Sequence, residues 1–89
     1  MQINSEEDFL ELRRRIQQWR RQFPTFSHDV NRIENIIEGH IQSYSIALMH
    51  YRQKHKQYYL EQAQSHIDEI NRVLATVEKL ELMALLSRR

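Results

Sequence analysis

The chain has 89 residues, of which 40% are hydrophobic and 28% charged, with 13 basic and 12 acidic side chains, one glycine, one proline and no cysteine. This length supports one domain, spanning residues 1–89, and the net charge of +1 excludes both a strongly basic nucleic-acid coat protein and an acidic nucleic-acid mimic. The missing cysteines exclude disulfides and thiol catalysis, and the scarcity of glycine and proline favours helices.

The N-terminal segment, residues 1–8, has neither the positive flank nor the apolar core of a secretion signal. Nowhere in the sequence do about 18 apolar residues run together, as a membrane-spanning helix requires. We therefore expect a cytoplasmic protein that makes no contact with membranes.

The first predicted helix covers residues 5–23. Asn4 or Ser5 can cap it, because the three acids that follow suit the positive end of the helix dipole. Its apolar residues recur every three or four positions, at Phe9, Leu12, Ile16, Trp19 and Phe23. This spacing places Trp19 in the core, and Pro24 ends the helix.

Five arginines lie beside or opposite this apolar face: Arg13, Arg14, Arg15, Arg20 and Arg21. Guanidinium groups can bind phosphates or an acidic partner. However, acids at the start of a helix and arginines towards its end are also what the helix dipole alone selects. We therefore favour a solvated face, with phosphate binding as the alternative.

The second predicted helix covers residues 28–52. Its apolar residues again follow helical spacing, at Val30, Ile33, Ile37, Ile41, Tyr44, Leu48 and Tyr51. Gly39 interrupts this pattern at a cost of about 1 kcal/mol relative to alanine, so we expect another helix to pack closely against it. His40 beside it is expected to be a partly buried structural histidine.

Residues 52–57 contain no apolar side chain, and the apolar pattern changes register across them. A turn here predicts an all-α, three-helix antiparallel bundle, with the third helix over residues 58–86. The alternative is a short helix packed on one very long helix from about residue 28 to 86, in a dimer. Residues 52–57 contain no glycine, proline or asparagine, which favours the long helix. Burial of the apolar residues within one chain favours the bundle, which we prefer. Ser65 with Asp68 also fits a capping box, which would start the last helix later.

The wider stretch from His50 to Tyr59 mixes basic and aromatic side chains, a combination that binds single-stranded nucleic acid by charge and stacking. Because its tyrosines continue the apolar pattern, a solvated helical junction is the preferred interpretation. The alternative function, a nucleic-acid-binding accessory or regulatory protein, would use Arg13, Arg14, Arg20, Arg21, Lys54 and Lys56.

The C-terminal leucine cluster consists of Leu80, Leu82, Met83, Leu85 and Leu86. These residues cover more than one side of a helix, so they either close the core or await a partner. Because chain ends are generally the least buried part of a domain, we expect them to bind a protein partner or a second copy. Arg88 and Arg89 follow, where positive charge complements a helix end.

No arrangement of residues indicates catalysis. Five histidines are present, but no two are three or four positions apart on one helix, and His66 with Glu69 alone is a weak metal-binding pair. A single glycine allows no glycine-rich phosphate loop. We therefore expect no enzyme activity, cofactor, metal or small-molecule substrate.

The run Asp29, Val30, Ile33, Ile36, Ile37 and His40, preceded by a helix with Trp19 in its apolar face, resembles the first two helices of a spectrin-type three-helix repeat. It covers about a third of a chain that is shorter than such repeats, and it implies a spacer or docking module. The preferred function is accordingly a non-catalytic helical protein–protein interaction module, such as an adaptor, chaperone-like protein or assembly component, that forms a homodimer.

Overall fold

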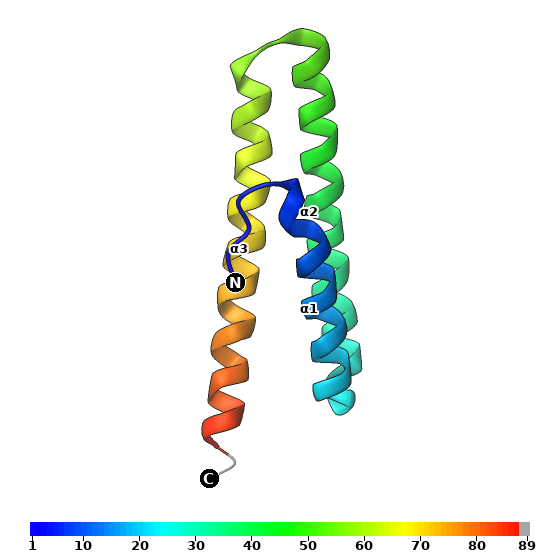
Figure 1. Ribbon diagram of the computed structural model, residues 1–89, viewed down its shortest axis with the longest axis vertical. Helices are drawn as coiled ribbons and strands as arrows, with labels where there is room; N and C mark the ends of the chain where they lie inside the picture. Colours follow the sequence, from blue (N-terminus) through cyan, green and yellow to red (C-terminus); the bar gives the residue numbers. More distant parts are fainter. Residues whose placement is uncertain (88–89) are drawn as a thin grey trace.

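The computed structural model describes residues 1–87 and confirms an all-α bundle of three helices, without strands in this part of the chain (Figure 1). Arg88 and Arg89, which we expected to complement the helix end, lie outside the described residues. Two short 3-10 turns are present, η1 (Glu6–Asp8) and η2 (Pro24–Phe26). The three helices are α1 (Phe9–Gln22), α2 (Ser27–Lys54) and α3 (Gln57–Leu86). Among the described residues, no helix is long and apolar enough to cross a membrane.

Helices α2 and α3 form a long antiparallel hairpin, which makes the molecule 54 Å long and 18 Å wide (Figure 1). The alternative of one unbroken helix is therefore wrong. The chain reverses at His55, whose backbone is left-handed with φ of 54°, and at Lys56, which is extended. Histidine is enriched among the few non-glycine residues found in the left-handed region, so the turn does not need glycine. Ser65 and Asp68 lie inside α3 and start no helix.

Helix α1 is half as long as the other two and lies along the part of the hairpin that is remote from the turn (Figure 1). It begins with η1, where the Asp8 carboxylate accepts hydrogen bonds from the backbone amides of Asn4 at 2.8 Å and Ser5 at 3.3 Å. The predicted start at residue 5 coincides with Ser5, the N-cap of η1, whereas α1 itself begins four residues later, at Phe9. The part of the hairpin beside the His55 turn has no third helix against it (Figure 1).

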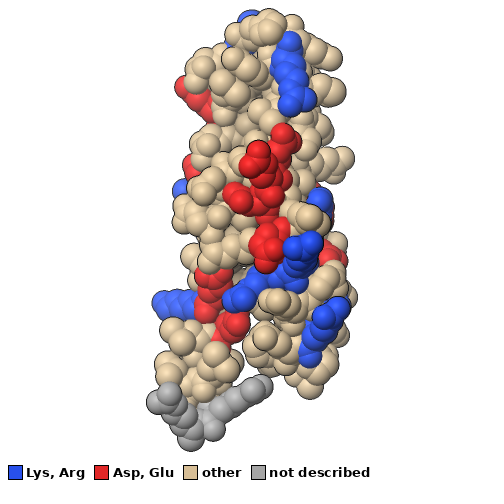
Figure 2. Space-filling model, in the orientation of Figure 1, with Lys and Arg blue, Asp and Glu red and all other residues tan. Residues whose placement is uncertain are grey.

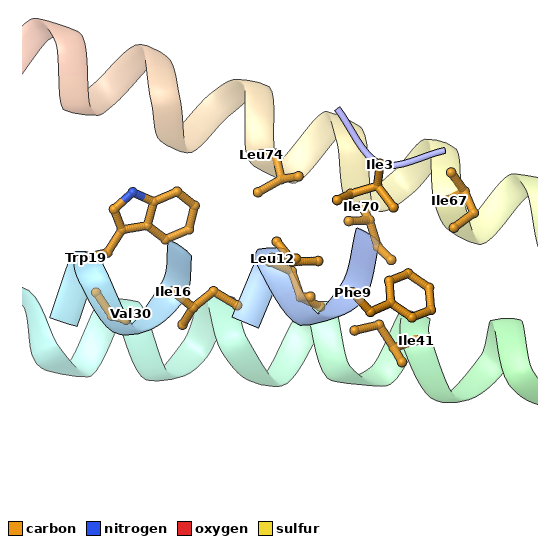
Figure 3. Close-up of a cluster of buried hydrophobic side chains, with 11 residues drawn as sticks. Ile3, Phe9, Leu12, Ile16, Trp19, Val30, Ile41, Ile67, Ile70 and Leu74 are labelled. Atoms are coloured by element: carbon orange, nitrogen blue, oxygen red, sulfur yellow. The ribbon is translucent and has the colours of Figure 1, made fainter. Parts of the chain in front are cut away.

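The buried core lies where α1 meets the hairpin (Figure 3). Trp19 is 1% exposed, as its position in the apolar pattern predicts. Ile3 is equally buried, although it precedes every helix. The Asn71 side chain on α3 holds it in place, because its Oδ1 accepts from the Ile3 amide at 2.7 Å and its Nδ2 donates to the Ile3 carbonyl at 2.8 Å.

Gly39 is exposed on α2, and a methyl group added there would meet no atom within 4 Å. The expectation that another helix packs closely against it is therefore wrong for the single chain. His40, beside it, is partly buried as predicted.

Candidate partner-binding site

The C-terminal leucine cluster lies on the last turns of α3. Its five side chains, Leu80, Leu82, Met83, Leu85 and Leu86, are 53 to 59% exposed. Helix α3 diverges from the other two helices beyond Leu74 (Figure 3). The cluster therefore does not close the core of the single chain.

An apolar groove, here called the end groove, opens beside the cluster where the helices diverge. It has a volume of about 610 Å³. Trp19 lines it from α1, Phe23 from the residue after α1, Phe26 from η2, Val30, Ile33 and Ile36 from α2, and Val77, Leu80 and Ala84 from α3. Its charged lining residues are Asp29, Arg32 and Glu81, so both signs of charge are present. Apolar walls with a few charged groups are typical of a surface that binds a helix.

Glu81 also lines a second, more polar concavity, which lies between α1 and α3. Its Oε2 accepts a hydrogen bond from the Trp19 indole at 3.0 Å and lies 3.5 Å from Arg15. Leu82 and Leu85 line this second concavity together with Met1, whose amino group lies 3.0 Å from Glu78. The cluster is thus flanked by apolar surface on one side and by ion pairs on the other.

The candidate nucleic-acid residues do not form one surface. Arg13 binds Glu38 with two hydrogen bonds, and Arg20 bonds Glu34, so these guanidinium groups bridge α1 to α2. Arg14 lies 3.5 Å from Glu11. On the face seen in Figure 2, basic and acidic side chains are interspersed. This arrangement supports the solvated-face interpretation.

Lys54 and Lys56 lie near the opposite end of the molecule from the arginines. Lys54 is 16 positions beyond Glu38 along α2, or about 24 Å at the rise of an α-helix. Its ammonium lies 3.3 Å from the Tyr59 hydroxyl. A single short stretch of nucleic acid could therefore not use all six predicted residues through one patch.

The ion pair between Arg13 and Glu38 changes the titration of both groups. Hydrogen bonding to Arg13 lowers the pKa of Glu38, although partial burial opposes this shift, and the same bond raises the pKa of Arg13. A lowered carboxyl pKa stabilises the fold above the ordinary titration range of glutamate, and this contribution is lost as the pH falls. Because both side chains are nearly half exposed, the pair contributes little to stability and acts mainly to orient α1 on α2.

Two histidines that are far apart in the sequence meet between α2 and α3. The Nδ1 atoms of His40 and His66 lie 3.0 Å apart, and both rings are partly buried. Sequence spacing missed this pair because it compares positions along one helix, whereas these residues face each other across the hairpin. Within residues 1–87, no group of three or more histidine, aspartate or glutamate side chains is placed to hold a metal ion.

Comparison with family models, curated proteins and solved structures finds no match to this chain.

Proposed function

We propose that this chain is a non-catalytic helical interaction module that pairs with a second copy of itself through the C-terminal end of α3. The observation that carries this proposal is the C-terminal leucine cluster beside the end groove. One chain thus supplies both projecting apolar side chains and an apolar groove in which such side chains can be buried. A two-fold dimer uses the same surface of each copy, so this self-complementarity fits a homodimer.

The exposed apolar area supports a second copy as the occupant. Phe26 and Ile36 at the end groove are about half exposed, as are the five residues of the cluster. A half-exposed side chain of this size leaves about 100 Å² of apolar surface in water, which makes roughly 700 Å² for the seven residues. A partner that covered all seven would bury an area close to the roughly 800 Å² that each partner buries in a standard interface.

Charge does not oppose the association of two copies. The net charge is +1, so the long-range repulsion between them is small. The charged residues of the end groove include both signs, so neither copy presents a surface of uniform charge to the other.

Sedimentation equilibrium over a range of protein concentrations tests this proposal. We expect a dimer for the natural chain, and a monomer for Leu80→Glu and for Leu86→Glu, because an unpaired carboxylate would be buried in the interface. Met49→Glu is the matched control, since Met49 is about as exposed but lies near the His55 turn, and it should remain dimeric.

A natural chain that stays monomeric at about 100 µM would contradict the proposal, because its affinity for a second copy would be too weak for a stable dimer. Dimers that persist in both leucine variants would contradict it as well. Added salt should leave the dimer intact or strengthen it, because apolar burial drives it. Retained nucleic acid that dissociates steeply with salt would instead indicate the nucleic-acid-binding alternative.

A further inference from the structure

His40 on α2 and His66 on α3 place two imidazole nitrogens 3.0 Å apart, with the rings tilted at 44° to each other. Four buried residues of the core, Ile37, Ile41, Ile67 and Ile70, lie on the same stretches of the two helices. The packing of these stretches fixes the backbones that carry the two rings. The short distance between the nitrogens is therefore a property of the folded hairpin.

Neutral imidazoles at this distance share one hydrogen bond, in which one Nδ1–H donates to the other Nδ1. The same distance suits two ligands of one metal ion. Zinc binds imidazole nitrogen at about 2.0 to 2.1 Å, which separates two ligand nitrogens by about 2.9 Å at a right angle and about 3.4 Å at the tetrahedral angle. The distance therefore allows both Nδ1 atoms to bind one ion once the two rings have rotated so that their lone pairs point to it.

We propose that His40 and His66 together bind a divalent transition-metal ion, which links α2 to α3. Imidazole is a good ligand for zinc, nickel and copper and a poor one for magnesium and calcium, so the chemistry selects the former group. On binding, the proton shared between the Nδ1 atoms moves to Nε2 of the ring that carried it. Both Nδ1 lone pairs then point at the ion, and no net proton is released.

Water can reach the pair from the side of His66, because His66, unlike His40, lines a concavity. This concavity has a volume of about 440 Å³ and is lined by polar side chains on both helices, among them Ser43, His50 and Gln62. With two protein ligands and several waters, the site would exchange its metal readily. This distinguishes it from a structural zinc site, which has four protein ligands and is closed.

The test compares thermal unfolding with and without zinc chloride, with magnesium chloride as the ionic control. At a zinc concentration tenfold above the dissociation constant, we expect the unfolding temperature to rise by about 5 to 10 °C, because zinc binds the folded pair. His40→Gln and His66→Gln should each abolish the rise. His28→Gln is the matched control, because His28 is exposed at the start of α2, and it should retain the rise.

Nuclear magnetic resonance of the histidine rings in the natural chain shows which histidines bind zinc without the use of any variant. Zinc should shift the ring signals of His40 and His66, and leave those of His28 and His55 in place. The proposal is overturned if zinc does not raise the unfolding temperature, if the rise persists in both glutamine variants, or if the exposed histidines are the ones that shift. Because the proposed dimer interface at the end groove involves other residues, a negative result for zinc binding would not contradict the homodimer proposal.

Discussion

Gly39 is the residue at which sequence reasoning and structure differ most. A glycine inside a helix is usually justified by a close neighbour, but no atom here would oppose a methyl group. Gly39→Ala should therefore raise the free energy of unfolding by about 1 kcal/mol, since glycine loses more backbone freedom than alanine on folding. Urea unfolding followed by circular dichroism measures this change.

Ala75→Gly is the matched control for Gly39→Ala, because Ala75 is an exposed alanine inside α3 and its loss should destabilise the chain by a similar amount. A Gly39→Ala chain that is less stable than the natural one would mean that this face of α2 is covered, in solution, by a second molecule.

His55 illustrates why the position of the turn could be predicted but its conformation could not. The absence of apolar residues over 52–57 located the break, because a helical turn without them has nothing to bury. The usual turn residues are missing, however, and the left-handed backbone of His55 is one that most side chains avoid. Its amide donates to the Tyr51 carbonyl at 2.7 Å, which caps α2.

At the scale of elements, two side chains of α3 hold the N-terminal segment, Glu78 at Met1 and Asn71 at Ile3. Asn71 bonds both backbone groups of Ile3, as a neighbouring strand would. Asn71→Ala should lower the free energy of unfolding by about 2 kcal/mol, because these partly buried groups would lose their partners. Hydrogen exchange should show the Ile3 amide losing most of its protection.

Asn35→Ala is the control for Asn71→Ala, since Asn35 is an exposed asparagine of α2, and its replacement should have little effect. If the Ile3 amide stays protected in Asn71→Ala, burial of the isoleucine side chain alone holds the segment.

The helix ends were predictable, whereas contacts between elements were not. The predicted boundaries at 23, 28, 52 and 58 lie within two residues of those observed, because apolar spacing and Pro24 depend on one helix at a time. The predicted start at residue 5 lies four residues before α1, because a 3-10 turn comes first. The burial of Ile3 and the meeting of His40 with His66 depend on how α3 folds back. The exposure of the C-terminal leucine cluster could be anticipated, but the end groove beside it depends on the divergence of α3 from the other two helices.

At the scale of the whole molecule, the shape of the single chain makes the position of the dimer interface measurable. One chain is 54 Å long and 18 Å wide, and the end groove lies at one end of it. A two-fold dimer joined there should have a maximum dimension about one and a half to two times that of one chain. Small-angle X-ray scattering of the natural chain, at a concentration where sedimentation shows a dimer, tests this expectation.

The same measurement distinguishes the proposed interface from the other exposed apolar surface of the hairpin. Ile46 and Met49 are exposed on α2, towards the His55 turn, where no third helix covers the hairpin. A dimer packed side by side over these residues would be wider but hardly longer than one chain. Scattering from such a compact dimer would contradict pairing through the end of α3, and Met49→Glu would then be the variant that dissociates it. An elongated dimer that Leu86→Glu dissociates and Met49→Glu does not would place the interface at the C-terminal leucine cluster.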